Sequence, residues 1–477
     1  GVSVVTLLYL RRFLKVFENI LNQSELNQVY LSSELVAFYH EIREQLLEKQ
    51  SFLNTNFSDE QRKEIVDVLG KAGSDYRNLI YQTGFLGDKM TVSLIGLKKF
   101  VNISLEFIEH TIKANQRKDA MYHAYNLLSV HPNSISIDYL NEMLEGQVAV
   151  LSSGFLTGKE SLQLLDALKK SRLFRADQYS YILYPNVDLP KFLEKNIIPE
   201  NEILKSKLVL KLLSDNNTQI VERDVIGQYH FNANFKNKAD LLETLNTLDK
   251  SYIPLIKEDT TLILDIFEKV FNHKAFTGRS GTFFAFEGLG SIYWHMVSKL
   301  HLAVQETCLA AINNQEDTSI ISKLMDHYFA IQAGIGVHKS PELYGAFPTD
   351  PYSHTPMHKG AQQPGMTGQV KEDILVKWGE LGVYAENGQL CFNPQILQMD
   401  AFDAKPKKVE FYPLNGDKEV ILLQEKSLMF SFCQTPIIYE ISNVDTIEIV
   451  WKAKALQSIN GFTLDIKTSQ TLFNRTG

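Results

Sequence analysis

The fold class of this chain is decided by one stretch, GMTGQVKEDILVKWGELGVYAENGQLCFNPQIL, residues 365–397. Its first half carries apolar residues at helical spacing, whereas its second half alternates apolar and polar residues as a strand does. Asn387-Gly388, where the pattern changes, is a strong signal for a hairpin turn. A helix repeats a face about every 3.6 residues and a strand every second residue, so the stretch predicts a change from helices to strands.

The sequence before this stretch is dominated by helical spacing. A stripe runs along 94–112 and places Leu94, Leu97, Val101, Leu105, Ile108 and Ile112 on one face. The same spacing predicts helices over 4–22, 25–49, 136–152, 159–172, 258–272, 286–312 and 317–333. The loops 173–200 and 334–364 are long and rich in aromatic residues, which indicates functional rather than disordered segments.

The sequence after this stretch reads as short strands separated by turn residues. The predicted strands are 409–414, 419–424, 428–433, 436–441, 446–451 and 462–467. Helices followed by strands predict a mainly α protein with a helical domain over 1–385 and an antiparallel β-sandwich over 386–477.

The composition excludes several classes of protein. The chain has 477 residues, which is too long for a single core, and a net charge of −8 gives no electrostatic basis for a nucleic-acid partner. No apolar run approaches the roughly 20 residues that a membrane span needs. The three cysteines, Cys308, Cys391 and Cys433, are too scattered for a disulfide framework or a zinc site and fit a reducing, cytoplasmic compartment.

The opening residues indicate a piece of a larger protein. Residues 2–10 are apolar and precede Arg11 and Arg12, the reverse of the order in a signal peptide. We therefore expect an N-terminal part of a parent chain as a partner, and the sequence leaves a homo-oligomer open.

The first candidate site segment is TGRSGTFFAFEGLGSIYWHMVSKL, residues 277–300. Its loop of Arg279, Ser280, Gly281 and Thr282 offers backbone, hydroxyl and guanidinium donors suited to an oxyanion. Glu287 stands at the start of the predicted helix, and His295 follows two turns later. The alternative is a tight turn ordered by an Arg279 ion pair, a carboxylate favoured by the helix dipole, and a core histidine.

A second candidate segment, residues 342–374, gathers polar residues around prolines and glycines. It contains Asp350, His354, His358, Gln362, Gln363 and Thr367. His354 and His358 have the spacing of a metal pair on a helix, but Pro356 lies between them. We expect no metal here and instead a polar loop that hydrogen-bonds sugar hydroxyls.

Two further segments, 115–128 and 171–196, place aromatic residues beside carboxylates and amides. A sugar-binding groove needs this combination, because ring faces stack on sugars while polar groups bind the hydroxyls. The predicted substrate-binding residues are Tyr122, His123, Asp177, Gln178, Trp294, His354, Gln362 and Gln363.

Taken in order, these segments resemble the (α/α)6-toroid glycoside hydrolases and phosphorylases, above all the cellobiose and chitobiose phosphorylase family. The stretch 365–397 resembles the junction between toroid and β-domain in that family, and FEGLGSIYWHMVSKL (286–300) resembles its Glu-Asn-Gly-Gly helix, whose histidine contacts phosphate. The resemblance implies a toroid over 1–385, an oligosaccharide substrate, and inorganic phosphate as a co-substrate without any other cofactor. The expected phosphate-binding residues are Arg279, Ser280, Gly281, Thr282, His295 and Thr367.

The catalytic acid is the least defined part of this prediction. The Gly-Asp-Trp-Asn-Asp run that holds the family's catalytic aspartate is missing here, and Asp119 is the best positional match. We expect burial to raise its pKa, with Glu287 and Asp350 as alternates, and all three carboxylates on one face with Asp177. Phosphorolysis and hydrolysis both stay open. The rival hypothesis is a non-catalytic carbohydrate-binding or scaffolding protein on a degenerate toroid.

Overall fold

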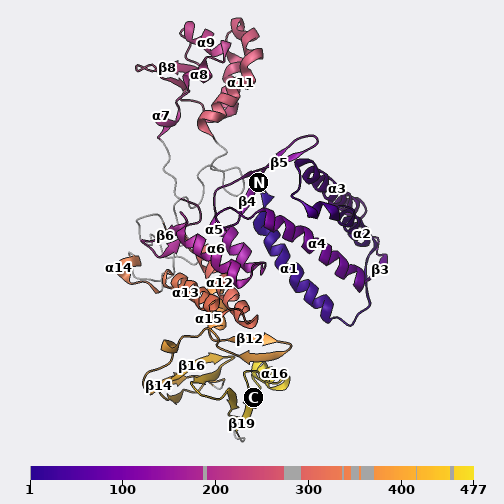
Figure 1. The fold of residues 1–477 in the computed structure, drawn as a ribbon, viewed down its shortest axis with the longest axis vertical. Helices are drawn as coiled ribbons and strands as arrows, with labels where there is room; N and C mark the ends of the chain where they lie inside the picture. Colours follow the sequence, from indigo (N-terminus) through magenta and orange to yellow (C-terminus); the bar gives the residue numbers. More distant parts are fainter. Residues whose placement is uncertain are drawn as a thin grey trace.

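The computed structural model describes residues 2–185, 191–272, 292–335, 338–344, 354–355, 370–414, 416–451 and 456–476. Figure 1 shows a helical body, a unit drawn above it that contains α7 to α11, and a C-terminal group of hairpins below it.

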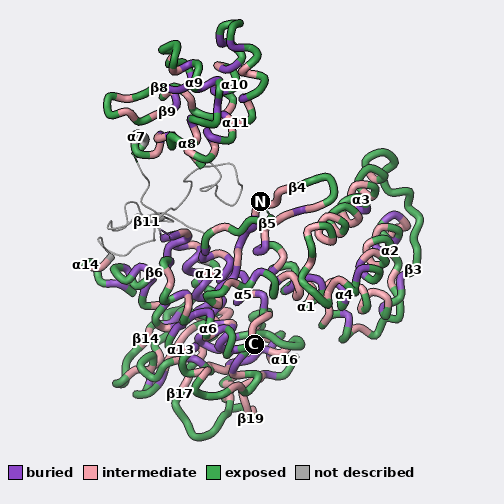
Figure 2. Tube along the Cα trace, turned by 45° about the horizontal axis from the view of Figure 1, so that its top comes forward, coloured by how far each residue is buried: buried purple, intermediate pink, exposed green. Residues whose placement is uncertain are grey.

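The helical body packs around one central helix, α12 (Trp294–Asn313). Most residues of α12 are buried, and Figure 2 shows the buried positions concentrated in this region. It packs against α5 (Leu144–Ser152), α6 (Gly158–Lys170), α13 (Thr318–Ala333) and α15 (Val370–Glu380), and α1 (Val4–Gln23) packs between α5 and α4 (Leu94–Ala114). These bounds confirm most of the helices predicted from apolar spacing.

Contacts along the helices fix their directions. Arg12 of α1 donates to the carbonyl of Ser152 and to Glu306, so the later parts of α5 and α12 lie together. At the other end, the Leu144 N–H donates to the Leu183 carbonyl, and strand β10 (Ile292–Tyr293), just before α12, packs on strand β7 (Ser180–Tyr181). The starts of α5, α12 and α15 therefore share one end with the ends of α6 and α13. We call this the upper end of the body, as it is drawn in Figure 1.

The helices of the body fall into two sets of opposite direction, so that α1 and α4, α5 and α6, and α12 and α13 form antiparallel pairs. One set contains α1, α5, α12 and α15, and the opposed set contains α4, α6 and α13. A toroid of paired helices requires such antiparallel pairs. The contacts do not demonstrate closure into six pairs, so the (α/α)6 toroid stays a prediction.

Two predicted helices begin as strands instead. Residues 28–32 form β2 (Gln28–Ser32), paired with β3 (Lys89–Ser93), before α2 (Ser33–Glu48) and α3 (Asp59–Thr83). Residues 135–139 form β5 (Ile135–Tyr139), paired with β4 (Tyr125–Val130), which itself pairs with β1 (Val2–Ser3). Both predictions were wrong at their N-terminal ends because cross-strand partners, distant in sequence or across a turn, override local helical spacing.

The unit within the predicted helical domain has a core of its own. Its elements are α7 (Phe192–Lys195), α8 (Glu200–Ile203), α9 (Lys207–Ser214), β8 (Val221–Arg223), β9 (Tyr229–Phe231), α10 (Lys238–Thr247) and α11 (Ile253–Phe271). Leu208, Leu212, Leu241 and Leu245 are fully buried there with Phe267, in an apolar cluster separate from that of the helical body. We call residues 191–272 the inserted unit.

The C-terminal region consists of antiparallel hairpins around a shared apolar core that includes Leu390 and Phe392. The pairs are β12 (Val383–Glu386) with β13 (Gln389–Phe392), β14 (Lys407–Phe411) with β15 (Glu419–Leu423), β16 (Ser427–Phe432) with β17 (Thr435–Glu440), and β18 (Thr446–Ile449) with β19 (Gln457–Asn460). The Asn387-Gly388 turn is confirmed, and the predicted boundary at 385/386 falls inside the first hairpin. Each of these described ladders has two strands, so a continuous β-sandwich stays a prediction.

The last predicted strand, 462–467, is confirmed only in its first half. Residues 462–464 pair antiparallel with β13 through backbone hydrogen bonds and a bridge from Thr463 to Cys391. The prediction is wrong from residue 466, where α16 (Ile466–Asn474) begins, because the Asp465 side chain accepts a hydrogen bond from the Thr468 N–H and so starts a helix.

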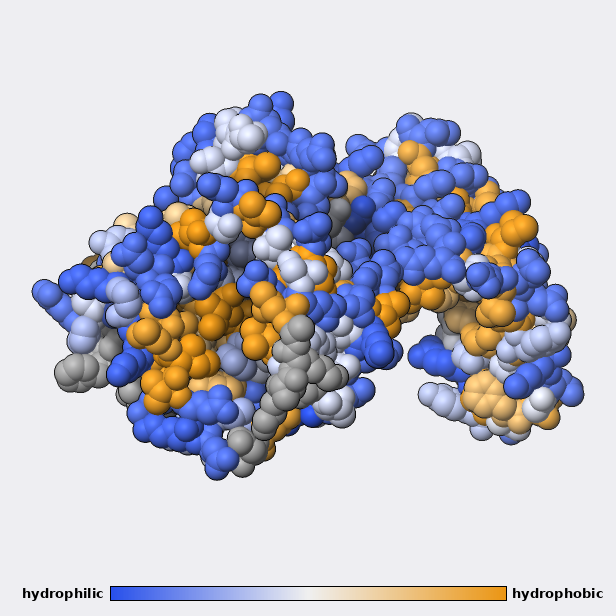
Figure 3. All heavy atoms as spheres, turned by 90° about the horizontal axis from the view of Figure 1, so that it is seen from below, coloured by the Kyte–Doolittle hydropathy of each residue, from blue (hydrophilic) through white to orange (hydrophobic). Residues whose placement is uncertain are grey.

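The outer surface carries scattered apolar side chains. Figure 3 shows them in several separate patches over the face seen from below. Within the described part of the chain, no helix is long and apolar enough to cross a membrane.

Candidate functional site

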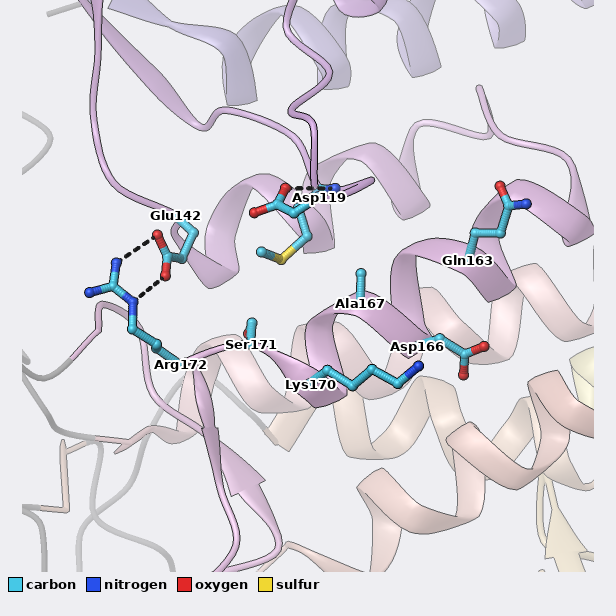
Figure 4. Close-up of a pocket in the computed structure, with 9 residues that line it drawn as sticks. Asp119, Glu142, Gln163, Asp166, Ala167, Lys170, Ser171 and Arg172 are labelled. Atoms are coloured by element: carbon cyan, nitrogen blue, oxygen red, sulfur yellow. Dashed lines mark hydrogen bonds and ion pairs between the residues drawn. The ribbon is translucent and has the colours of Figure 1, made fainter.

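A pocket of about 560 Å³ lies at the upper end of the body. Figure 4 shows it between the second half of α6 and the turn that carries Asp119. It is lined by Asp119, Met121, Glu142, Gln163, Asp166, Ala167, Lys170, Ser171 and Arg172. The pocket therefore brings a sequence-predicted catalytic residue together with polar residues that the sequence did not single out.

The carboxylates of this pocket are held by cationic or imidazole partners. Glu142 accepts two hydrogen bonds from Arg172, at 2.9 and 3.1 Å, and Asp166 lies 2.9 Å from His327. Burial raises the pKa of Glu142. The hydrogen bonds that its carboxylate accepts from Arg172 and from the Glu142 backbone outweigh burial, so the pKa of Glu142 is lowered. Glu142 and Arg172 thus form a two-hydrogen-bond ion pair between a buried carboxylate and an exposed guanidinium at the edge of the pocket.

Asp119 is ion-paired rather than poised as an acid. Its carboxylate accepts from Arg117 at 2.8 Å and from the Met121 N–H at 3.2 Å, and its side chain is 42% exposed. Burial raises the pKa of Asp119, but the hydrogen bonds and charge of Arg117 outweigh it, so the pKa is lowered. The expectation of a raised pKa is wrong for this conformation, because it considered apolar neighbours and overlooked an arginine two residues away.

Tyr122 and His123, both predicted to bind substrate, differ in burial. Tyr122 belongs to the apolar core of the body, and its burial raises its pKa to about 12. His123 stacks on Tyr139 with ring centroids 4.2 Å apart, and burial followed by the charge of Arg117 lowers its pKa to about 4. Neither residue lines the pocket.

A second polar cluster unites three other predicted residues around Lys339. The short hairpin of β6 (Phe174–Arg175) and β7 (Ser180–Tyr181) carries Asp177 and Gln178. The Lys339 ammonium donates to Gln178 Oε1 at 3.0 Å and lies 4.8 Å from the ring centroid of Trp294. Asp177 pairs with the buried Arg175, at 2.6 Å for the shorter contact.

Lys339 itself is buried in an unusual setting for a lysine. It is 5% exposed, and desolvation followed by the charge of Arg175 lowers its pKa to about 8, while Asp177 opposes that shift. A buried amine with a depressed pKa is a frequent mark of a functional site. The sequence offered no signal for Lys339, because its partners Gln178 and Trp294 belong to other segments and meet it only in the folded chain.

His295 lies beside a buried carboxylate at the same end of the body. Its Nε2 atom is 3.8 Å from Oε1 of Glu372, whose side chain is 4% exposed. The Tyr293 hydroxyl is 3.4 Å from His295 Nδ1. Burial and the charge of Lys299 lower the pKa of His295, while Glu372 opposes this effect. Sequence reasoning missed Glu372 although it lies within the segment 342–374.

Several predicted residues cannot be placed. Glu287, Asp350, Gln362, Gln363, Arg279, Ser280, Gly281, Thr282 and Thr367 lie outside the described residues. The backbone of His354 belongs to β11 (His354–Thr355), which pairs with β10 (Ile292–Tyr293), so the second candidate segment reaches the start of α12. Of the carboxylates expected on one face, Asp119 and Asp177 both lie at the upper end of the body.

The residues that the structure describes include no group of histidine, cysteine and acidic side chains able to hold a metal ion.

The comparisons with known proteins concern the inserted unit. A family model described as GH149 phosphorylase insertion domain 2 matches residues 189–274. This match supports a relationship to the glycoside phosphorylases. None of the curated proteins compared with the chain matches it. The matched range contains the inserted unit, which has its own apolar core and lies between β7 and β10 in the sequence.

Proposed function

We propose that this chain is a glycoside phosphorylase that cleaves oligosaccharides with inorganic phosphate. The observation that carries the proposal is the match of a phosphorylase insertion domain to the separately folded inserted unit. The site supports it, since polar and aromatic side chains from several elements gather at the upper end of the body.

The proposed substrate sites are divided between the two clusters. The pocket between α6 and Asp119 receives sugar hydroxyls through Glu142, Arg172 and Gln163. Asp177, Gln178 and Trp294 bind a further part of the oligosaccharide beside Lys339. The phosphate is bound by the Arg279 loop with His295 and Thr367, as the resemblance implies.

The proposed reaction inverts the configuration at the sugar carbon. Phosphate is its own nucleophile, so the protein supplies one carboxylic acid that protonates the leaving oxygen. Asp119 fills this role only if substrate separates it from Arg117, because the ion pair keeps it ionised. Glu287 and Asp350 stay as alternates. The closer relation to cellobiose and chitobiose phosphorylases, and the closed toroid, belong to the same proposal.

The test is an oligosaccharide panel incubated with the full chain, with and without inorganic phosphate, followed by detection of sugar phosphate. Phosphate-dependent release supports the proposal, whereas equal cleavage without phosphate identifies a hydrolase. Asp119→Asn lowers turnover by about a hundredfold or more if Asp119 is the acid. Asp138→Asn, an exposed position on β5, is the matched control.

The second candidate is a non-catalytic carbohydrate-binding protein. The low pKa and ion pair of Asp119 favour it, because this aspartate is not poised to donate a proton. Oligosaccharide binding by calorimetry, with no cleavage under either condition, distinguishes this candidate from the enzyme.

A further inference from the structure

Two buried polar atoms meet where α12 and α15 begin. His295 lies in the first turn of α12, and Glu372 lies in the first turn of α15. Their closest atoms, Nε2 and Oε1, are 3.8 Å apart, which is too long for a hydrogen bond. Within the described residues, neither His295 Nε2 nor the second carboxylate oxygen of Glu372, Oε2, has a hydrogen-bond partner.

Leaving these two buried atoms without hydrogen-bond partners costs free energy unless a ligand supplies the partners. A buried carboxylate oxygen without a donor loses its hydration without compensation, and a buried imidazole nitrogen does so to a smaller degree. Both atoms lie at helix N-termini, where free N–H groups and the helix dipole favour negative charge. Glu372 Oε2 can accept a hydrogen bond, and His295 Nε2 can accept or donate one. Together the two atoms fit a ligand that carries a hydroxyl group.

The charged groups around the couple favour an anionic ligand. Lys299 of α12 and Lys371 of α15 both act on His295, and Glu372 is the opposing negative charge. Lys371 lies 3.8 Å from Glu372, and the Tyr293 hydroxyl faces the other ring nitrogen of His295. Burial and Glu372 raise the pKa of the adjacent Asp373. An anion that also has a hydroxyl satisfies both lysines and both unpartnered atoms, and hydrogen phosphate is such an anion.

We propose that Glu372 and His295 form a proton-accepting couple that receives the hydroxyl proton of hydrogen phosphate during phosphorolysis. The inference rests on the proposed phosphorylase function and deepens it. It assigns Glu372 as a positioning residue, which acts through His295.

The proposed step consumes only the oligosaccharide and hydrogen phosphate. A phosphate oxygen forms a bond to the sugar carbon while the glycosidic carbon–oxygen bond breaks, and the general acid protonates the leaving oxygen. The remaining phosphate proton passes to His295 Nε2, and the imidazolium is stabilised by the Glu372 carboxylate. Proton transfer from His295 through solvent to the ionised acid restores both groups, so no other reactant is needed.

The decisive variant is Glu372→Gln, which keeps the shape of the side chain and removes its charge. We expect kcat/KM for phosphate to fall by about tenfold or more, since a positioned base contributes about a hundredfold or more. Glu372 raises the pKa of His295, so its loss moves the acidic limb of the pH profile to lower pH. The matched control, Asp326→Asn, removes an exposed carboxylate of α13 and leaves both quantities unchanged.

A second measurement is independent of turnover and of the stability of the variant. Histidine-labelled full chain is titrated by NMR with and without inorganic phosphate, and His295→Gln identifies the resonance of His295. We expect phosphate to raise the pKa of His295, because the bound dianion stabilises the imidazolium. An enzyme that shows phosphorolysis but no such rise, or whose Glu372→Gln variant matches Asp326→Asn, overturns the inference alone. An unmutated chain without phosphate-dependent cleavage overturns the proposed function itself.

Discussion

Two buried polar side chains of the inserted unit are fully hydrogen-bonded, whereas several buried polar atoms at the upper end of the body are not. In the inserted unit, the Asp259 carboxylate accepts from both Ser206 and the Leu208 N–H at 2.8 Å. The Asn196 amide pairs with both the carbonyl and the N–H of Phe231. At the upper end, by contrast, Lys339 is buried with a depressed pKa, and atoms of His295 and Glu372 lack partners within the described chain.

This difference in hydrogen bonding distinguishes buried groups that stabilise the fold from buried groups that can bind a ligand. Fully paired buried groups contribute to one well-defined fold, whereas incompletely paired groups keep a free-energy cost that a ligand can remove. The contrast indicates a structural role for the core of the inserted unit and a binding role for the upper end. Four substitutions test this contrast.

The largest expected effect is on the separate core of the inserted unit. Leu241→Ala empties a fully buried position of α10 and lowers the free energy of unfolding of this unit by about 2–5 kcal/mol. Leu242→Ala, at the exposed neighbouring position, is the control. Hydrogen exchange then shows lost protection in 191–272 and unchanged protection in α12. A simultaneous loss in α12 would mean that the two cores unfold together and the comparison fails.

The next effect is the pH dependence of stability at Lys339. Its pKa is lowered from 10.5 to about 8, so the unfolded chain binds more protons between these pH values. Unfolding free energy therefore rises with pH across this window, by about 3 kcal/mol at most for this group. Lys339→Met removes that rise, and Lys323→Met on the exposed face of α13 retains it. Denaturant titrations at pH 7, 9 and 10.5 measure it, and an unchanged slope in Lys339→Met contradicts the assignment.

A smaller effect is expected from Asp259, the fully paired counterpart. Asp259→Ala leaves the Ser206 hydroxyl and the Leu208 N–H without their acceptor and costs about 1–3 kcal/mol. Asp265→Ala, exposed on the same helix α11, is the control. Chemical unfolding of both variants gives the values, and catalytic rates stay at the level of the unmutated chain. Loss of activity without loss of stability would place function in this core.

The smallest effect on stability is expected at Arg117. Arg117→Gln removes an ion pair with the well-exposed Asp119 and a longer one, at 3.5 Å, with Glu142, which keeps Arg172 as its partner, so the stability changes by about 1 kcal/mol. The pKa of Asp119 then rises, because burial remains and the opposing charge is gone. If Asp119 is the general acid, the basic limb of the pH–rate profile moves to higher pH. Lys118→Gln serves as control, and an unmoved limb transfers the role to another carboxylate.

Sequence reasoning succeeded where local pattern decides structure. The apolar spacing located α1, α4, α6, α12 and α13, and the alternation located most of the C-terminal hairpins. It failed at β2 and β5, where pairing with other strands overrides helical spacing, and at α16, where one capping aspartate reverses the pattern. The inserted unit had no local signature, because a separate core is defined by which distant residues pack together.

For the site, the sequence by itself determined which residue types occur near the upper end: Asp119, Asp177, Gln178, Trp294 and His295 all came from patterns of aromatic and polar residues. Only the tertiary structure decided their chemistry. Arg117 fixes Asp119 as an ionised group, Tyr122 belongs to the core, and Lys339 and Glu372 become prominent through burial. The physical reason is that a pKa depends on desolvation and on charges within a few ångströms, and these neighbours are brought together by packing rather than by position in the chain.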